Sequence, residues 1–319
     1  MSDPASPLTL DARALSRSFA GRPVVRDVEI KVGRGEVLGF LGPNGAGKTT
    51  TMQMLTGNLS PGAGSISICG ADLLMHPVAA KRHVGYLPET PPLYKELSVT
   101  EYLELAARLH RVAKQKVASA AANARERCGL AAVGNRLIGT LSKGYQQRVG
   151  IAQAIVHEPD LMILDEPTVG LDPNQIREIR SLIRELGRGR GVILSTHILP
   201  EVETVCDRVQ IMHEGNVVFS GTVEALRALR GGRALVVGLR RPPPIAELEA
   251  VPGVARAEAT GRDLFRIEPE ADADVGEEIV RRAVAQGWRL FQIAPAQASL
   301  EEIFGHLTQR EDASAEVAA

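Results

Sequence analysis

The sequence lacks several features that mark particular classes of protein. Its three cysteines, Cys69, Cys128 and Cys206, are far apart and form no CxxC pair, which suggests neither a disulfide framework nor a zinc site. We therefore expect reduced thiols in a cytosolic protein. No apolar run approaches the roughly 18 residues of a membrane span, and the opening MSDPASPLTL does not resemble a signal peptide. Any membrane role is expected to come through a partner.

An excess of charge of one sign is also missing. The chain has 37 Lys and Arg against 38 Asp and Glu, a formal net charge of −1. Near-neutral charge removes the usual electrostatic argument for sequence-independent binding, so no nucleic acid is expected, although a local basic patch stays open. The length of 319 residues fits one large and one small domain, or two of similar size.

Short apolar runs alternate with longer segments of helical period from about residue 8 to residue 223. The most continuously apolar runs are residues 37–42, 84–88, 161–165 and 192–196. Such runs are typical of strands buried on both faces of a mostly parallel sheet, which predicts an α/β fold. Residues 25–32 alternate instead and predict an antiparallel strand with one solvated face. Residues 209–221 predict a strand pair at the edge of the domain.

Two regions depart from this alternation. Residues 90–160 have a helical pattern that opens with a capping-box sequence at Ser98 and Glu101, which predicts a helical subdomain inserted into the sheet. After a linker at 230–233, the order strand, helix, strand, strand, helix, strand predicts a small ferredoxin-like α+β domain over residues 230–308, including a final helix. We expect residues 309–319 to be a disordered tail.

The segment GPNGAGKTT follows an apolar strand and opens a helical segment, which is the context of a phosphate-binding P-loop. Its glycines, Gly42, Gly45 and Gly47, let the backbone curl so that amide hydrogens point inward at a helix N-terminus. Lys48 is expected to reach the β and γ phosphates, and the hydroxyl of Thr49 to ligate Mg²⁺. An ordinary glycine turn is the alternative, which the flanking strand and helix disfavour. The remaining residues assigned to this nucleotide site are Asn44, Ala46 and Thr50.

Two adjacent acids, Asp165 and Glu166, end the apolar run LMILD. Ligands bind at the carboxyl ends of parallel strands, so Asp165 is well placed to hold Mg²⁺ through water. Glu166 is expected to polarise an attacking water as general base, a contribution typically worth about 10² to 10⁴ in rate. Such a pair is often only a helix cap. Together with the P-loop, however, it indicates hydrolysis of a nucleoside triphosphate.

With both motifs placed, residues 8–225 resemble the ATP-binding subunit of ABC transporters. The segment LSKGYQQR, residues 141–148, is similar to the family signature LSGGQ. The resemblance implies a P-loop fold with antiparallel and helical subdomains and a domain spanning residues 8–229. It also implies a head-to-tail dimer in which Ser142 and the amide of Gly144 face the γ phosphate of ATP held by the other subunit. Ser142 as a plain N-cap is the alternative, and both can hold.

Further positions agree with the family pattern. The resemblance implies that Phe19 stacks on adenine, that His197 contacts the γ phosphate, and that Asp172, in the loop VGLD, lies near the partner's P-loop. A core phenylalanine and a structural histidine are the alternatives for the first two.

Three positions depart from the family pattern. Tyr145 replaces the signature glutamine, and Lys143 stands before Gly144. Glu89 stands where the family has a glutamine that approaches Mg²⁺ and the attacking water. A carboxylate can still ligate Mg²⁺ but adds negative charge near the γ phosphate, so we expect Glu89 to slow hydrolysis while keeping coupling. These variants, together with the small C-terminal domain, resemble ATPases that serve exporters with a separate membrane subunit.

The favoured function is therefore transport driven by ATP and Mg²⁺. Two ATPase subunits, identical or different, are expected to close on two ATP at the cytoplasmic face of the membrane and to move a separate permease. The alternative is a soluble ATPase acting on DNA or ribosomes. The segment between Lys48 and Asp165 has no coiled coil or zinc module, and the chain holds one ATPase unit, which disfavours that alternative. A kinase or GTPase is disfavoured by the lack of an NKxD sequence. We expect the C-terminal domain to stabilise the dimer rather than to sense a ligand.

Overall fold

The computed structural model describes residues 8–230, 234–270 and 273–296, and the chain divides after Val223 into two compact units. The first unit carries the predicted α/β fold, and the second is a small α+β unit. Helix α8 (Val223–Arg230) begins at the division. No helix among the described residues is both long enough and apolar enough to cross a membrane.

An antiparallel sheet forms one layer of the first unit. Its strands, in the sheet order β2-β1-β4-β5, are β1 (Leu8–Phe19), β2 (Arg22–Gly33), β4 (Ala63–Ile68) and β5 (Ala71–Asp72). In β2, Val28, Ile30 and Val32 are buried while Glu29 and Lys31 between them are exposed. This burial confirms the strand with one solvated face that the alternating sequence predicts.

The central sheet has the strand order β10-β9-β3-β8-β7-β6. Its strands are β3 (Val37–Leu41), β6 (Val84–Leu87), β7 (Leu161–Asp165), β8 (Gly191–Thr196), β9 (Arg208–His213) and β10 (Asn216–Thr222). All neighbours pair in parallel except β10, which is antiparallel to β9. Every residue of β3, β7 and β8 is buried, which explains their continuously apolar sequences. The carboxyl ends of these three strands therefore lie side by side, where ligands bind in such sheets.

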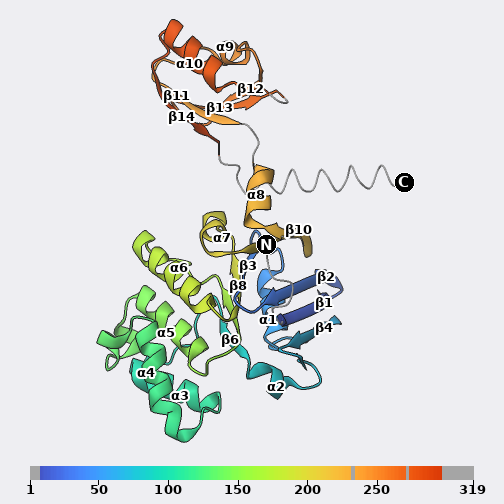
Figure 1. Ribbon diagram of the computed structural model, residues 1–319, viewed down its shortest axis with the longest axis vertical. Coiled ribbons are helices and arrows are strands. Elements are labelled where there is room, and N and C mark those ends of the chain that lie inside the picture. Colours follow the sequence, from blue (N-terminus) through green and yellow to red (C-terminus); the bar gives the residue numbers. More distant parts are fainter. Residues whose placement is uncertain (1–7, 231–233, 271–272, 297–319) are drawn as a thin grey trace. The chain divides into compact units, whose positions relative to one another are not determined.

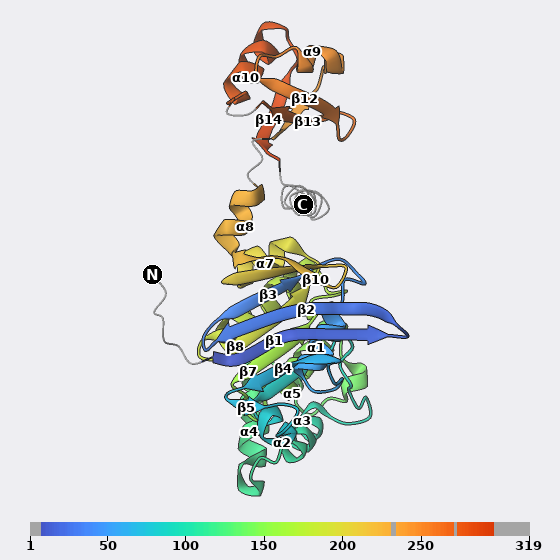
Figure 2. The same cartoon turned by 90° about the vertical axis from the view of Figure 1, so that its right-hand side faces the viewer.

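Helix α1 joins the two layers of the first unit. It contacts β2 of the antiparallel sheet and β7 and β8 of the central sheet. Phe40, Met52, Ile66 and Ile193, from both sheets and from α1, belong to one buried core cluster. Figure 2 shows β1, β2 and β4 side by side as one layer. The P-loop helix is thus held by apolar packing on two sides.

The segment between β6 and β7 is helical. Helices α3, α4 and α5 pack against one another, and Figure 1 shows them away from β1, β2 and β4. Ser98 and Glu101 form the predicted capping box at the start of α3. The helices of this unit are α1 (Lys48–Leu55), α2 (Pro77–Lys81), α3 (Val99–Leu109), α4 (Val117–Arg127), α5 (Lys143–Ile155), α6 (Pro173–Gly187) and α7 (Leu199–Val205), with 3₁₀ turns at Lys114–Lys116, Ala131–Val133 and Ile138–Thr140.

The second unit has the predicted order of strands and helices. Its elements are β11 (Leu235–Leu239), α9 (Ile245–Glu249), β12 (Val254–Ala259), β13 (Leu264–Pro269), α10 (Gly276–Ala285) and β14 (Leu290–Pro295). Neighbouring strands are antiparallel, in the order β12-β13-β11-β14. The last strand begins only at Leu290, because Trp288 is buried in the core and Arg289 has a left-handed φ of 55°. The predicted final helix and tail lie outside the described residues.

Candidate nucleotide-binding site

The P-loop spans the gap between β3, which ends at Leu41, and α1, which begins at Lys48. Two of its glycines are required by close backbone packing. A Cβ on Gly42 would lie 2.3 Å from the carbonyl oxygen of Met212. Gly47 has a left-handed φ of 105°, and a Cβ there would lie 2.7 Å from the carbonyl oxygen of Val24. The loop is thus clamped between β9 and β2 at the N-terminus of α1.

Lys48 lies beneath the P-loop and is 6% exposed. Its Nζ donates hydrogen bonds to the carbonyl oxygens of Gly42, at 2.7 Å, and Pro43, at 3.1 Å. The same nitrogen lies 3.6 Å from Oε1 of Glu166. The cation therefore links the P-loop to the residue that follows β7.

Asp165, the last residue of β7, is fully buried, and neither of its carboxylate oxygens has a hydrogen-bond partner. Ser195, paired with it on β8, is also buried with an unpartnered Oγ. Burial and the neighbouring Asp165 raise the pKa of Tyr86 to about 12. A buried, unpaired carboxylate costs several kcal/mol unless a cation or donors satisfy it. This donor set of carboxylate and hydroxyl oxygens fits Mg²⁺, a hard cation that prefers oxygen ligands.

Glu166 turns sharply away from the strand that precedes it. Its φ of 48° is left-handed, a conformation that costs about 1 kcal/mol or more for a residue other than glycine, and its amide donates to the carbonyl oxygen of Ser195 at 3.0 Å. The carboxylate meets Nδ1 of His197, which follows β8, at 3.0 Å from each oxygen. The turn therefore separates the two acids, so that Asp165 stays buried in the sheet while Glu166 lines a pocket.

A pocket of about 300 Å³ collects most of the predicted site residues. It is lined by Val24, Asn44, Gly45, Gly47, Lys48, Thr49, Thr50, Glu89, Glu166, Val169 and His197. Gly42 and Ala46 complete the loop behind this lining: Gly42 accepts from Lys48, and Ala46 accepts from the amide of Gly215. Sequence reasoning missed Val24, because only the tertiary approach of β2 to Gly47 brings it here. No local pattern marks such a residue.

The signature residues lie elsewhere in the first unit, at the start of α5. Ser142 is the N-cap, and its Oγ accepts from the amide of Tyr145 at 3.4 Å. Gly144 is buried, and a Cβ there would lie 2.5 Å from the side chain of Gln175 on α6. Neither Ser142 nor Gly144 is among the residues that line the P-loop pocket.

Asp172 and Phe19 also lie outside the lining of the P-loop pocket. Asp172 is the N-cap of α6, in a capping box with Gln175. Phe19 ends β1 and is 44% exposed, with the guanidinium carbon of Arg17 at 5.1 Å from its ring centroid. Phe19 is thus not a core residue.

The fold and this pocket define a P-loop nucleoside triphosphatase. Comparison with known proteins identifies the family within this class: the model of the ABC transporter family matches residues 25–169. Nod factor export ATP-binding protein I of Rhizobium johnstonii is 32% identical over 96% of both chains. Daunorubicin resistance ATP-binding protein DrrA3 of Streptomyces coeruleorubidus is 32% identical over 92% of this chain and 93% of its own.

A solved structure agrees with these relatives. The cbiO1 protein of Clostridium perfringens, part of the ABC transporter complex cbiONQ, superposes with a TM-score of 0.64 and 30% identity. It covers 70% of this chain and 91% of its own. The chain therefore belongs to the ABC transporter family as an ATP-binding subunit, and its enzymatic activity is ATP hydrolysis. This membership favours transport over a soluble machine acting on DNA or ribosomes.

Proposed function

We propose that two ATPase subunits close head to tail on two ATP and that hydrolysis drives a separate membrane permease in export. The observation that carries the dimer is the position of the signature: Ser142 and Gly144 do not line the P-loop pocket of their own chain. The N-terminus of α5 would favour a phosphate group, but Ser142 and Gly144 are outside the pocket of their own chain, so the phosphate has to come from a nucleotide held elsewhere. The second subunit supplies it.

Export is supported by the relatives that align over almost the whole chain. One is named for Nod factor export and another for daunorubicin resistance. Both alignments extend beyond the ATPase unit. In this proposal the permease is a separate chain, as the family resemblance implies, and the ATPase would lie at the cytoplasmic face of the membrane through that partner.

We assign the chemistry as follows. Lys48 and the amides of the P-loop bind the β and γ phosphates, and Glu166 accepts a proton from the attacking water. His197, in contact with Glu166, orients that carboxylate and reaches the γ phosphate. Thr49, Asp165 and Glu89 would hold Mg²⁺, which when bound neutralises charge on the phosphates.

The remaining assignments concern the nucleotide held by the partner subunit, the adenine ring of ATP, and the second unit. Ser142, Gly144 and Asp172 serve the site shared with the other subunit, and Phe19 stacks on adenine from its exposed position at the end of β1. The second unit is a ferredoxin-like accessory domain that stabilises the dimer. Its order of elements and its sheet order β12-β13-β11-β14 support the ferredoxin-like fold.

Trapping the closed dimer tests this proposal. Glu166→Gln keeps the shape of the side chain but removes the base, so ATP stays bound and the dimer does not reopen. Size-exclusion chromatography under saturating Mg-ATP should show a dimer for this variant, and a monomer with ADP. Glu96→Gln, at an exposed position before α3, is the matched control and should behave as wild type. A Glu166→Gln protein that stays monomeric with Mg-ATP would count against the head-to-tail dimer.

A further inference from the structure

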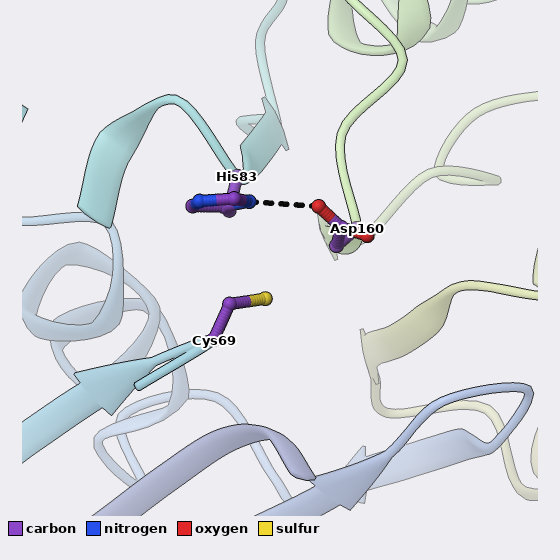
Figure 3. A group of neighbouring side chains, drawn as sticks. All are labelled: Cys69, His83 and Asp160. Atoms are coloured by element: carbon purple, nitrogen blue, oxygen red, sulfur yellow. Dashed lines mark hydrogen bonds and ion pairs between the residues drawn. The ribbon is translucent and has the colours of Figure 1, made fainter. Parts of the chain in front are cut away.

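A cluster of Cys69, His83 and Asp160 lies away from the nucleotide site (Figure 3). His83 immediately precedes β6 and Asp160 immediately precedes β7, so both lie at the amino ends of parallel strands. The nucleotide pocket lies at the carboxyl ends of the same sheet. Cys69 follows β4, in the turn to β5. The cluster therefore joins the turn after β4 of the antiparallel sheet to the end of the central sheet that lies opposite the nucleotide pocket.

The three side chains converge on one small volume. One ligand atom from each residue lies within 4.8 Å of the others. Nδ1 of His83 lies 2.7 Å from Oδ2 of Asp160, and the guanidinium of Arg34 pairs with the other oxygen, Oδ1. Arg34 thus holds the carboxylate while leaving Oδ2 directed toward the imidazole. Figure 3 shows the sulfur of Cys69 pointing toward the space beside this contact.

These distances suit a small cation after minor movement. In tetrahedral sites, zinc lies about 2.3 Å from sulfur and about 2.0–2.2 Å from nitrogen and oxygen, which separates the ligand atoms by roughly 3.3–3.7 Å. The imidazole and carboxylate would move apart slightly from 2.7 Å, and the sulfur would approach by on the order of 1 Å. Cys69 is accessible to solvent, so its side chain has room for that movement.

A catalytic thiol explains the cluster less well. In a Cys-His-Asp arrangement for nucleophilic attack, one ring nitrogen faces the acid and the other faces the sulfur. Here the sulfur lies on the side of the His83 and Asp160 contact (Figure 3). Burial and the nearby Asp160 also raise the pKa of the Cys69 thiol, which is opposite to the activation that a nucleophile needs.

A plain ion-pair network does not need Cys69, whose thiol otherwise makes one weak contact, at 3.9 Å to the carbonyl oxygen of Thr9. Arg34, His83 and Asp160 would form that network without a thiol. Cys69 and Gly70 are the two central residues of a tight hairpin turn, with φ values of 48° and 82°. Such turns favour Asn, Asp or Gly at the first position, so local preference does not account for a cysteine there.

We propose that Cys69, His83 and Asp160 form a binding site for a divalent cation of the Zn²⁺ class, with a fourth position open to water. Thiolate and imidazole ligands favour such ions over Mg²⁺. On binding, the Cys69 thiol releases its proton to solvent, and His83 binds through Nδ1 as a neutral imidazole with its one N–H on Nε2. Arg34 stays on the second carboxylate oxygen. The cation would fasten the turn after β4 to the starts of β6 and β7. This site is independent of ATP and Mg²⁺.

Cobalt titration of the tag-free, metal-free full-length protein tests the site. Co²⁺ bound by a thiolate has a charge-transfer absorption that oxygen and nitrogen ligands do not produce. We expect this absorption to saturate near one Co²⁺ per chain, to be displaced by Zn²⁺, and to persist in excess Mg²⁺. Cys69→Ser should abolish it, and His83→Gln should weaken Co²⁺ binding at least about tenfold. His76→Gln, at an exposed histidine, should leave binding unchanged.

A second measurement reads the thiol directly. Zn²⁺ should slow alkylation of Cys69 at least tenfold in the wild-type protein, whereas Cys128 and Cys206 are buried and serve as internal references. ATP hydrolysis by Cys69→Ser should match wild type, which shows that the variant is folded. An absorption that persists in Cys69→Ser, or alkylation rates equal with and without Zn²⁺, would overturn the proposal.

Discussion

Nδ1 of His197 lies 3.0 Å from both carboxylate oxygens of Glu166. The two residues follow neighbouring strands, β7 and β8, whose carboxyl ends meet at the pocket. The carboxylate is 7% exposed while the imidazole is 43% exposed, so the histidine covers the acid on its solvent side. In the proposed function, this relationship would make His197 a positioning residue for the general base Glu166 as well as a group that faces the γ phosphate.

Replacing His197 should therefore lower the rate of hydrolysis more than the affinity for ATP. For His197→Ala we expect kcat to fall by about 10²-fold, because misplacing a catalytic group by about 1 Å costs that much. The dissociation constant of ATP should change by less than about threefold, since Lys48 and the P-loop amides are untouched. Steady-state rates and equilibrium ATP binding measure the two quantities.

The double variant Glu166→Gln/His197→Ala separates positioning from an independent role. Residues that act as a unit are not additive, so the double variant should be no slower than Glu166→Gln alone. His76→Ala, at an exposed position, serves as the control. A further tenfold loss in the double variant would mean that His197 acts apart from Glu166.

Glu89 offers a test of how local charge sets the rate. It lines the P-loop pocket and also a second pocket that Lys143 and Gln147 line. Removing its charge in Glu89→Gln should speed hydrolysis because repulsion of the γ phosphate is relieved. Glu89 is exposed, so solvent screens the effect, and we expect a gain of about two- to fivefold.

The same variant should need more Mg²⁺, because an amide oxygen is a weaker ligand than a carboxylate. Initial rates over a range of Mg²⁺ concentrations measure both effects, with Glu96→Gln as the control. If neither the rate nor the Mg²⁺ dependence changes in Glu89→Gln, the idea that Glu89 slows hydrolysis is wrong.

Local sequence was sufficient to predict the parts of the site that are contiguous in the chain. The P-loop follows the buried strand β3 and the pair Asp165 and Glu166 stands at the end of the buried strand β7. Both strands have continuously apolar sequences, so the place of these residues at the sheet edge follows from pattern alone. Glu89 and His197 needed the family resemblance, because nothing near them marks a ligand. The described pocket brings both together with Lys48.

Contacts between distant segments could not be predicted in this way. Val24 reaches the pocket because β2 packs against Gly47. Packing between segments that are far apart in the sequence leaves no local sequence signal. The cluster of Cys69, His83 and Asp160 was missed for the same reason, since metal sites are found in sequence by short spacings such as CxxC. Here the three residues are far apart in the sequence and are brought together by the turn after β4 and by the starts of the parallel strands β6 and β7.

The signature provides a ranking test. Ser142 both caps α5 and, in our proposal, faces phosphate, whereas Tyr145 is 40% exposed on the helix. Ser142→Ala should therefore impair hydrolysis more than Tyr145→Gln does. Loss of an N-cap costs about 1 kcal/mol of stability, so stability has to be measured by urea denaturation alongside the rate.

Ser142→Asp distinguishes the two roles of this serine. Aspartate is a good N-cap and is favoured at a helix N-terminus, so stability should be kept. Its charge would repel phosphate, so hydrolysis should fall at least as far as in Ser142→Ala. A stable Ser142→Asp protein with wild-type activity would mean that the capping role alone matters and that the motif faces other atoms.

Two stacked histidines predict a loss of stability in mild acid. The rings of His110 and His157 lie 3.8 Å apart and nearly parallel, and Nε2 of His157 bonds the carbonyl oxygen of Val84 at 3.0 Å. Burial, together with the neighbouring His110, lowers the pKa of His157 to about 4. The unfolded chain binds this proton with an ordinary pKa of about 6.5, so protons favour unfolding between these two values.

The free energy of unfolding should thus be unaffected by His157 above about pH 7 and should fall as the pH is lowered toward about 4. Linkage predicts a loss of about 2 kcal/mol between pH 7 and pH 5 from this group. In His157→Gln the titrating group is gone. The variant should be less stable at pH 7, because the stack is lost, yet should lose less stability between pH 7 and pH 5.

Urea denaturation at both pH values measures the difference, and His76→Gln, at an exposed histidine, is the matched control. The control should follow wild type because the side chain of His76 is exposed and is not part of the buried ring stack. If His157→Gln loses as much stability as wild type between pH 7 and pH 5, the acid sensitivity arises at other groups and the stacked pair does not restrict protonation of His157.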